Sequence, residues 1–150
     1  GDQNQLEDFF AWFSALPVRN RLFVPGNHDL PFELSPDSAK SMIPENVIFL
    51  ENDGVTLNGI RFYSLPARPW MYAPLYLPSG VDVLITHGAP LGIMDKGFGC
   101  RILRRLIDSA QPAVHIFGHA HFTGGQSARE GKTRFYNVAH YDSGCMENSL

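Results

Sequence analysis

The sequence is poor in cysteine, in net charge and in long apolar runs, and each shortage excludes a class of protein. Only 2 of the 150 residues are cysteine, Cys100 and Cys145, which is too few for a disulfide scaffold, and we interpret both as reduced thiols. The formal net charge of -3 and the pI near 6.0 argue against a basic nucleic-acid-binding domain. No apolar run approaches the ~20 residues that a membrane-spanning helix needs. We therefore predict no nucleic-acid or membrane partner, and the low cysteine count favours a cytoplasmic protein.

The composition is that of an ordinary globular domain. Hydrophobic residues make up 44% and charged residues 18%, whereas disordered chains combine low hydrophobicity with high charge. Eleven Phe, five Tyr and two Trp supply material for a core. The length is that of one domain, so we expect a single unit over residues 1–150.

The hydrophobic pattern mixes strand–helix units with hairpins. Apolar residues at helical spacing predict an opening helix that ends at Pro17, and further helices over 36–43 and 100–110. The segments 47–50, 55–58 and 60–65 read as an antiparallel meander, because turn residues separate them. The other predicted strands cover 21–24, 81–86, 113–117, 123–127 and 133–138. This order fits a layered α/β domain with mixed sheets.

Four of the six histidines closely follow a predicted strand and lie in a loop that contains glycine. Ligand sites of open α/β sheets form at the carboxyl ends of strands, so these histidines are expected to share one edge. Imidazole, amide oxygen and carboxylate ligands without thiolate suit Mn, Fe or Zn. The motifs are Gly26-Asn27-His28-Asp29, Thr86-His87-Gly88 and Gly118-His119-Ala120-His121.

In this order, the three motifs resemble the last three signature blocks of the calcineurin-like metallophosphoesterase superfamily, and Gly1-Asp2 matches the block before them. Finer features resemble the class III cyclic-nucleotide-phosphodiesterase-like branch, which includes metallophosphoesterase-domain-containing proteins. These features are Trp12 with Leu16-Pro17, the stretch from Gly92-Ile93-Met94-Asp95 to Gly99-Cys100, and the strand before His119. The resemblance implies a layered β-sandwich of mixed sheets flanked by helices. The family's Asp-x-His block is missing, so we expect an N-terminally truncated domain.

The resemblance also implies a function and a set of site residues. It implies metal-dependent hydrolysis of phosphoesters, with phosphodiesters as the expected substrates and a nucleotide as one candidate. The family centre is dinuclear and holds divalent ions such as Mn, Fe or Zn, with a metal-bound hydroxide attacking phosphorus. The implied metal ligands are Asp2 as a bridge, Asn27, His87 and His119 on one ion and His121 on the other, while His28 assists the leaving oxygen and Asp29 orients His28.

Other interpretations of the same residues stay open. With the first block missing, one ion keeps only Asp2 and His121, so the chain could be a catalytically inactive module that binds a single metal. A mononuclear iron oxygenase with two histidines and a carboxylate is a third reading, but it leaves Asn27 unexplained. Taken singly, each histidine could be a loop residue bonded to the backbone, and the sequence around Asp29 could be a simple turn.

Several residues outside the motifs also carry expectations. His115 lies inside an apolar strand and is interpreted as a core histidine, and Cys100 is interpreted as structural. The aromatic residues Trp70, Tyr72 and Tyr76 either line a substrate cleft or anchor a proline-rich loop. A truncated sheet would leave strand 22–24 with an unpaired edge, so we expect dimerisation, segment exchange or poor solubility.

Overall fold

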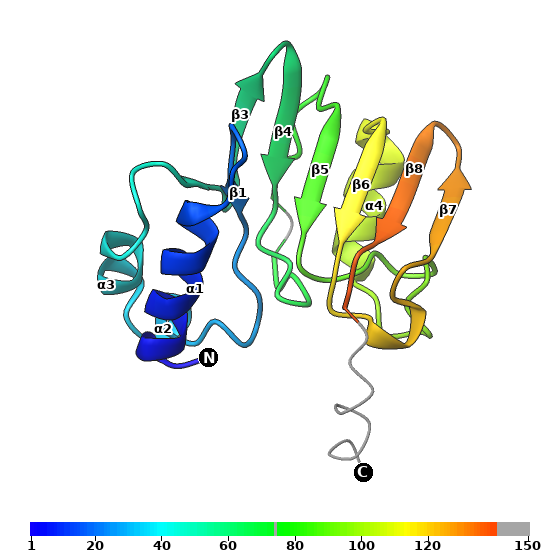
Figure 1. Cartoon of the computed structure of the whole chain (residues 1–150). Helices are drawn as coiled ribbons and strands as arrows, with labels where there is room; N and C mark the ends of the chain where they lie inside the picture. Colours follow the sequence, from blue (N-terminus) through cyan, green and yellow to red (C-terminus); the bar gives the residue numbers. More distant parts are fainter. Residues whose placement is uncertain (74, 141–150) are drawn as a thin grey trace.

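The computed structural model describes residues 1–73 and 75–140, and Figure 1 shows a broad sheet with a helical region at one side. Cys145 lies outside the described residues. The helices are α1 (Gln3–Ala15), α2 (Pro31–Leu34), α3 (Pro36–Ser41) and α4 (Arg101–Ala110), with a 3-10 turn η1 (His121–Thr123). The strands are β1 (Leu22–Phe23), β2 (Ile48–Phe49), β3 (Asp53–Leu57), β4 (Ile60–Ser64), β5 (Val83–Thr86), β6 (Val114–Phe117), β7 (Ser127–Glu130) and β8 (Thr133–Asn137). None of the helices in the described ranges is both long and apolar enough to cross a membrane.

The main sheet has six strands in the order β3-β4-β5-β6-β8-β7. Its four central strands, β4, β5, β6 and β8, are parallel, and antiparallel strands β3 and β7 form the two edges. All four parallel strands therefore end at the same edge of the sheet, which is the lower edge in Figure 1. The mixed sheet with flanking helices confirms the predicted layered α/β fold.

The two faces of the central strands are covered to different extents. One face packs against α4, where Leu84, Phe117 and Leu103 are almost fully buried in one core cluster. The residues that alternate with them on the other face, such as Ile85 and Ile116, are only half-buried. Parallel strands are usually buried on both faces. Here the face that packs against α4 is the better buried of the two, so it supplies most of the packing energy of the sheet.

A second, smaller core lies in the helical region of α1, α2 and α3. Phe10, Phe23 and Phe32 are buried there, and successive phenylalanine rings contact one another with centroids 5.0 to 5.6 Å apart. The spacing of apolar residues along α1 follows the helical period, which is why the opening helix was predictable.

Three details differ from the sequence-based expectation. The predicted meander over 47–65 is wrong in its first step, because β2 pairs parallel with β1 in a separate two-stranded sheet. The turn at Asn52, with φ 52°, redirects the chain away from β2, and the antiparallel hairpin forms only between β3 and β4. The helix α2 was not predicted. Strand β7 begins at Ser127 rather than at 123, because η1 and the following glycines occupy that stretch.

β1 has β2 on one side and, within residues 1–73 and 75–140, no strand on the other. This agrees with the expected open edge at 22–24. Dimerisation or segment exchange through that edge stays a prediction, to be checked by the oligomeric state in solution.

Replacing a core leucine of α4 should cost far more stability than replacing an exposed one. Leu103 is fully buried against the sheet, so Leu103→Ala should lower the free energy of unfolding by about 2–5 kcal/mol through lost burial and a residual cavity. Leu34 is 78% exposed, and Leu34→Ala should change stability by less than about 0.5 kcal/mol. Urea denaturation of both variants checks this, and equal losses would contradict the assigned core.

Candidate metal centre

Two histidines are brought together by the pairing of β5 and β6. In this parallel pair Thr86 lies opposite Phe117, so the next residues, His87 and Gly118, also leave the sheet side by side. The N–H of Gly118 donates to the carbonyl oxygen of His87 at 3.0 Å, which extends the strand pairing by one step. As a result the rings of His87 and His119 meet edge to face, with their centroids 5.0 Å apart.

A third residue reaches His87 from the loop after β1. The Nε2 atom of His87 lies 2.7 Å from the amide oxygen of Asn27. An amide oxygen only accepts, so this contact is a hydrogen bond when the neutral ring carries its proton on Nε2. With the proton on Nδ1 instead, Nε2 offers its lone pair to a metal ion. The contact joins residues that are 60 positions apart in the sequence, one in the loop after β1 and the other at the end of β5.

The close approach of the two loops depends on Gly26. A Cβ atom at this buried position would lie 2.6 Å from Nδ1 and Cε1 of His87. The loop is closed by Asp29, whose carboxylate accepts from the N–H of Gly26 at 2.7 Å. The backbone N–H of Asp29 also donates to the carbonyl oxygen of Gly26 at 3.2 Å. In the structure Asp29 therefore fixes the shape of the loop that presents Asn27.

Two histidines of this edge, His87 and His119, are held in the neutral form. Burial, followed by the charges of His119, His28, Arg68 and His121, lowers the pKa of His87 to about 4. Burial, followed by His121 and His28, also lowers the pKa of His119. Neutral imidazole is the form that binds metal ions, so these ligands need no deprotonation near neutral pH.

The donor atoms at this point suit a divalent metal ion. Two atoms bound to one ion at about 2.0–2.2 Å each would lie roughly 3 Å apart, close to the separation of Asn27 Oδ1 and His87 Nε2. His119 lies next to them. Within the described part of the chain, however, no three His, Cys, Asp or Glu side chains converge closely enough to form a ligand group. The structure thus brings together Asn27, His87 and His119 and does not gather all the predicted ligands.

The remaining predicted residues lie around this group in other roles. Asp2 caps α1, where its carboxylate accepts from the N–H of Gln5 at 2.9 Å. The N-terminal amine donates to the carbonyl oxygen of His28, so the start of the chain lies against the same loop. His28 and His121 are both exposed, and His121 begins the turn η1. Their catalytic and ligand roles stay predictions.

A buried hydrogen-bond chain behind His87 was not foreseen. The hydroxyl of Thr86 donates to the carbonyl oxygen of Gly88 at 2.7 Å and lies 2.8 Å from Nε2 of His115. A hydroxyl has one proton, so Thr86 accepts from His115, which is neutral with its proton on Nε2. His115 is fully buried between Phe117 and Phe135, which confirms its interpretation as a core histidine.

Arg68 was not among the predicted site residues, but its charge acts on His87. Arg68 is half-buried and forms an ion pair with Glu51, and burial lowers its pKa against the opposing charges of Glu33 and Asp29. A single arginine in a proline-rich loop gave no sequence signal for this position.

Cys100 is a buried free thiol at the start of α4, and its Sγ accepts from the N–H groups of Met71 and Leu103, which confirms its structural role.

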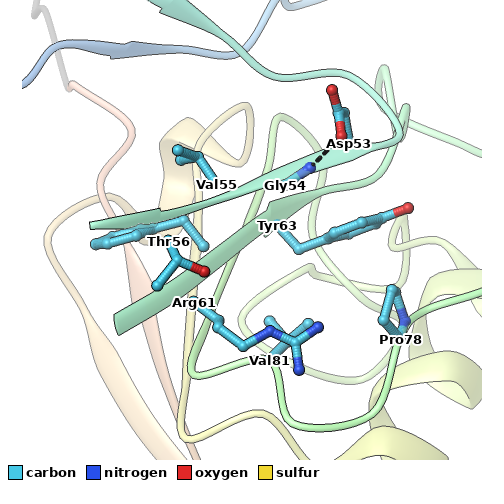
Figure 2. Close-up of a pocket in the computed structure, with 9 residues that line it drawn as sticks. Asp53, Gly54, Val55, Thr56, Arg61, Tyr63, Pro78 and Val81 are labelled. Atoms are coloured by element: carbon cyan, nitrogen blue, oxygen red, sulfur yellow. Dashed lines mark hydrogen bonds between the residues drawn. The ribbon is translucent and has the colours of Figure 1, made fainter. Parts of the chain in front are cut away.

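A separate hollow of about 250 Å³ lies on the β3–β4 hairpin. Figure 2 shows residues that line it. It is lined by residues such as Asp53, Tyr63 and Arg61, and it shares no residue with the histidine group. Asp53 uses its carboxylate on the N–H of Gly54, at 2.7 Å, as the dashed line marks. We therefore place the chemistry at the strand ends and not at this hairpin.

Adding a methyl group at Gly26 should displace the ring of His87. The Cβ of Gly26→Ala would overlap the ring, whereas the Cβ of Gly118→Ala would meet only the His87 carbonyl oxygen at an ordinary 3.8 Å. We expect the imidazole NMR signals of His87 to shift in Gly26→Ala and to stay almost unchanged in Gly118→Ala. Equal spectra for the two variants would show that the loops are not packed as described.

Burial of His115 should make the protein less stable in acid. Burial lowers the pKa of His115 to about 3, below its unfolded value of about 6.5. The stabilisation is therefore present above about pH 6.5 and is lost as the pH falls toward 3, because the unfolded state gains the proton first. Between pH 7.5 and 4.5 the unfolding free energy should fall by about 2–3 kcal/mol more in the natural protein than in His115→Leu. Urea titrations at both pH values check this, with the exposed His140→Leu as the control; a slope unchanged by His115→Leu would refute it.

Comparison with known proteins agrees with the geometry. The sequence profile of the calcineurin-like phosphoesterase family matches residues 1–122. The human and mouse proteins named metallophosphoesterase domain-containing protein 1 are each 29% identical over 182 residues, which cover 93% of this chain and 56% of theirs. The Caenorhabditis elegans UPF0046 protein K07C11.7 is 32% identical over 174 residues, covering 96% of this chain and 60% of its own length. The chain thus spans less than two thirds of these relatives. On this evidence it belongs to the calcineurin-like phosphoesterase family, in the branch of the metallophosphoesterase domain-containing and UPF0046 proteins.

Proposed function

We propose that the lower edge of the sheet is a metal-dependent phosphoesterase site that acts on phosphodiesters. The observation that carries the proposal is the contact between Asn27 and His87, with His119 beside it. These three residues come from three different strand ends, and all three offer neutral donor atoms that suit Mn, Fe or Zn. Membership of a phosphoesterase family supports phosphoester hydrolysis in general, and the choice of phosphodiesters is ours.

In this proposal Asn27, His87 and His119 would hold one divalent ion, His121 would serve a second, and Asp2 would be shared between the two. Such ions supply Lewis-acid chemistry toward water and phosphate oxygens when they are bound. The chain's own contribution is the fixed position of the ligands. Gly118 N–H holds the His87 carbonyl, and Asp29 closes the loop that carries Asn27.

His28 is proposed to protonate the leaving oxygen of the substrate. Its side chain is exposed, so it can meet a phosphoester at the opening of the site. Its backbone is held, because the carboxylate of Asp29 closes its loop by accepting from the N–H of Gly26. Asp29 then acts on His28 through the loop backbone, as a positioning residue.

One observation favours a second candidate function. The carboxylate of Asp2 caps α1 through Oδ1, which is therefore already engaged by the N–H of Gln5. If that bond keeps Asp2 from serving a second ion, the chain is an inactive module that binds one ion. The number of ions bound per chain separates the two, because the enzyme is expected to bind two and the inactive module one.

Hydrolysis of bis(4-nitrophenyl) phosphate in the presence of Mn²⁺ tests the proposal. We expect turnover that a chelator abolishes and that Asn27→Ala and His87→Ala each reduce by about 100-fold or more, because each loses a ligand of the ion. Asn20 is exposed and lies before β1, outside the loop that carries Asn27, so Asn20→Ala is the matched control and should retain full activity.

Turnover that survives both the chelator and the two substitutions would refute the proposed site. Tight binding of a single ion per chain without turnover would instead select the inactive module.

A further inference from the structure

A hollow lined by aromatic residues lies directly beside His119. We call it the aromatic slot and define it by Trp70, Met94, Phe98, His119 and Phe122, which line a space of about 240 Å³. Three of these side chains are unusually open for large hydrophobic residues: Trp70 is 45%, Phe98 71% and Phe122 65% exposed. Exposed apolar side chains that gather around one hollow indicate a ligand site.

The slot is built from three segments that are tied to one another. The indole N–H of Trp70 donates to the carbonyl oxygen of Phe98 at 2.7 Å, which joins the proline-rich loop to the loop over 92–99. The hydroxyl of Thr123, next to Phe122, donates to the carbonyl oxygen of Met94. The walls are therefore set in place by hydrogen bonds within the protein.

The loop over 92–99 is held in an unusual conformation around a carboxylate. Asp95 is buried, and its Oδ2 accepts from the N–H groups of Gly92 at 3.0 Å and Gly99 at 2.8 Å. Within this loop Met94 and Lys96 have φ values of 50° and 48°, in the left-handed region that most residues avoid. Strained backbone of this kind concentrates where a protein holds a ligand.

The charge at the slot suits an anion. The ammonium of Lys96 lies 4.6 Å from the centre of the Phe122 ring, a cation–π contact that keeps the positive charge at the rim. The one carboxylate in the lining, Asp95, is directed at backbone N–H groups. A ligand with a flat ring and a nearby negative group would therefore match both the walls and the rim.

From these observations we propose that the slot binds a flat aromatic group esterified to the phosphate of the substrate. This rests on the proposed function only for the phosphate, which would lie toward His119 and His87. The ring would pack between Trp70, Phe98 and Phe122, where stacking on aromatic faces stabilises planar groups of any ring type. The slot thereby selects aryl phosphoesters over small aliphatic ones.

Fluorescence of Trp70 gives a direct test that does not depend on turnover. The sequence has two tryptophans, so Trp12→Phe leaves Trp70 as the single reporter. Phenyl phosphate and methyl phosphate, which differ by the ring alone, are titrated into this variant with Mn²⁺ present. We expect phenyl phosphate to quench Trp70 and to bind about tenfold more tightly than methyl phosphate, from stacking in the slot.

Substitutions in the slot wall complete the test. Phe98→Ala and Phe122→Ala should each reduce the preference for phenyl phosphate by about threefold or more, with the affinity for methyl phosphate unchanged. Tyr76 is 74% exposed and does not line the slot, so Tyr76→Ala is the control and should retain the preference.

Equal affinity for the two phosphates, no binding of phenyl phosphate, or an unchanged preference in Phe98→Ala and Phe122→Ala would each overturn the slot. The proposed function fails separately. A preference for phenyl phosphate without hydrolysis of any phosphodiester would support the aromatic slot and refute the proposed activity. Hydrolysis of a phosphodiester without a preference for phenyl phosphate would support the proposed activity and refute the slot.

Discussion

The hydrogen bonds between β5 and β6 determine where the chemistry of this protein can lie. Their parallel pairing sets Thr86 opposite Phe117 and lets Gly118 bond to His87, so His87 and His119 leave the sheet as neighbours. A shift of this pairing by one residue would turn His115 out of the core and separate the two rings. Strand pairing therefore fixes the site before any ligand is involved.

The candidate centre also joins the loop after β1 to the end of β5. Asn27 and Gly26 follow β1 of the helical region, and they contact His87 at the end of β5 in the main sheet. A group that binds both Asn27 and His87 would therefore tie these two segments together and stabilise the folded state by mass action. The same junction leads directly to the aromatic slot through His119.

Much of this arrangement was predictable from the sequence, and the parts that were not have physical reasons. Apolar runs before Gly26, His87 and Gly118 located the strand ends, because a buried parallel strand is a short continuous apolar segment. The partner of β2 was not predictable, since a two-residue strand fits several neighbours equally well. The capping role of Asp2 and the approach of Arg68 depend on tertiary contacts that no local pattern records.

The most direct measurement of the central claim is the location of Mn²⁺ on the folded chain by paramagnetic NMR broadening. The account predicts that signals of Asn27, His87 and His119 disappear first at low Mn²⁺ and that those of the β3–β4 hairpin stay sharp. Broadening centred on the hairpin or on scattered carboxylates, with the three site residues unaffected, would contradict the assignment of the metal centre to the strand ends.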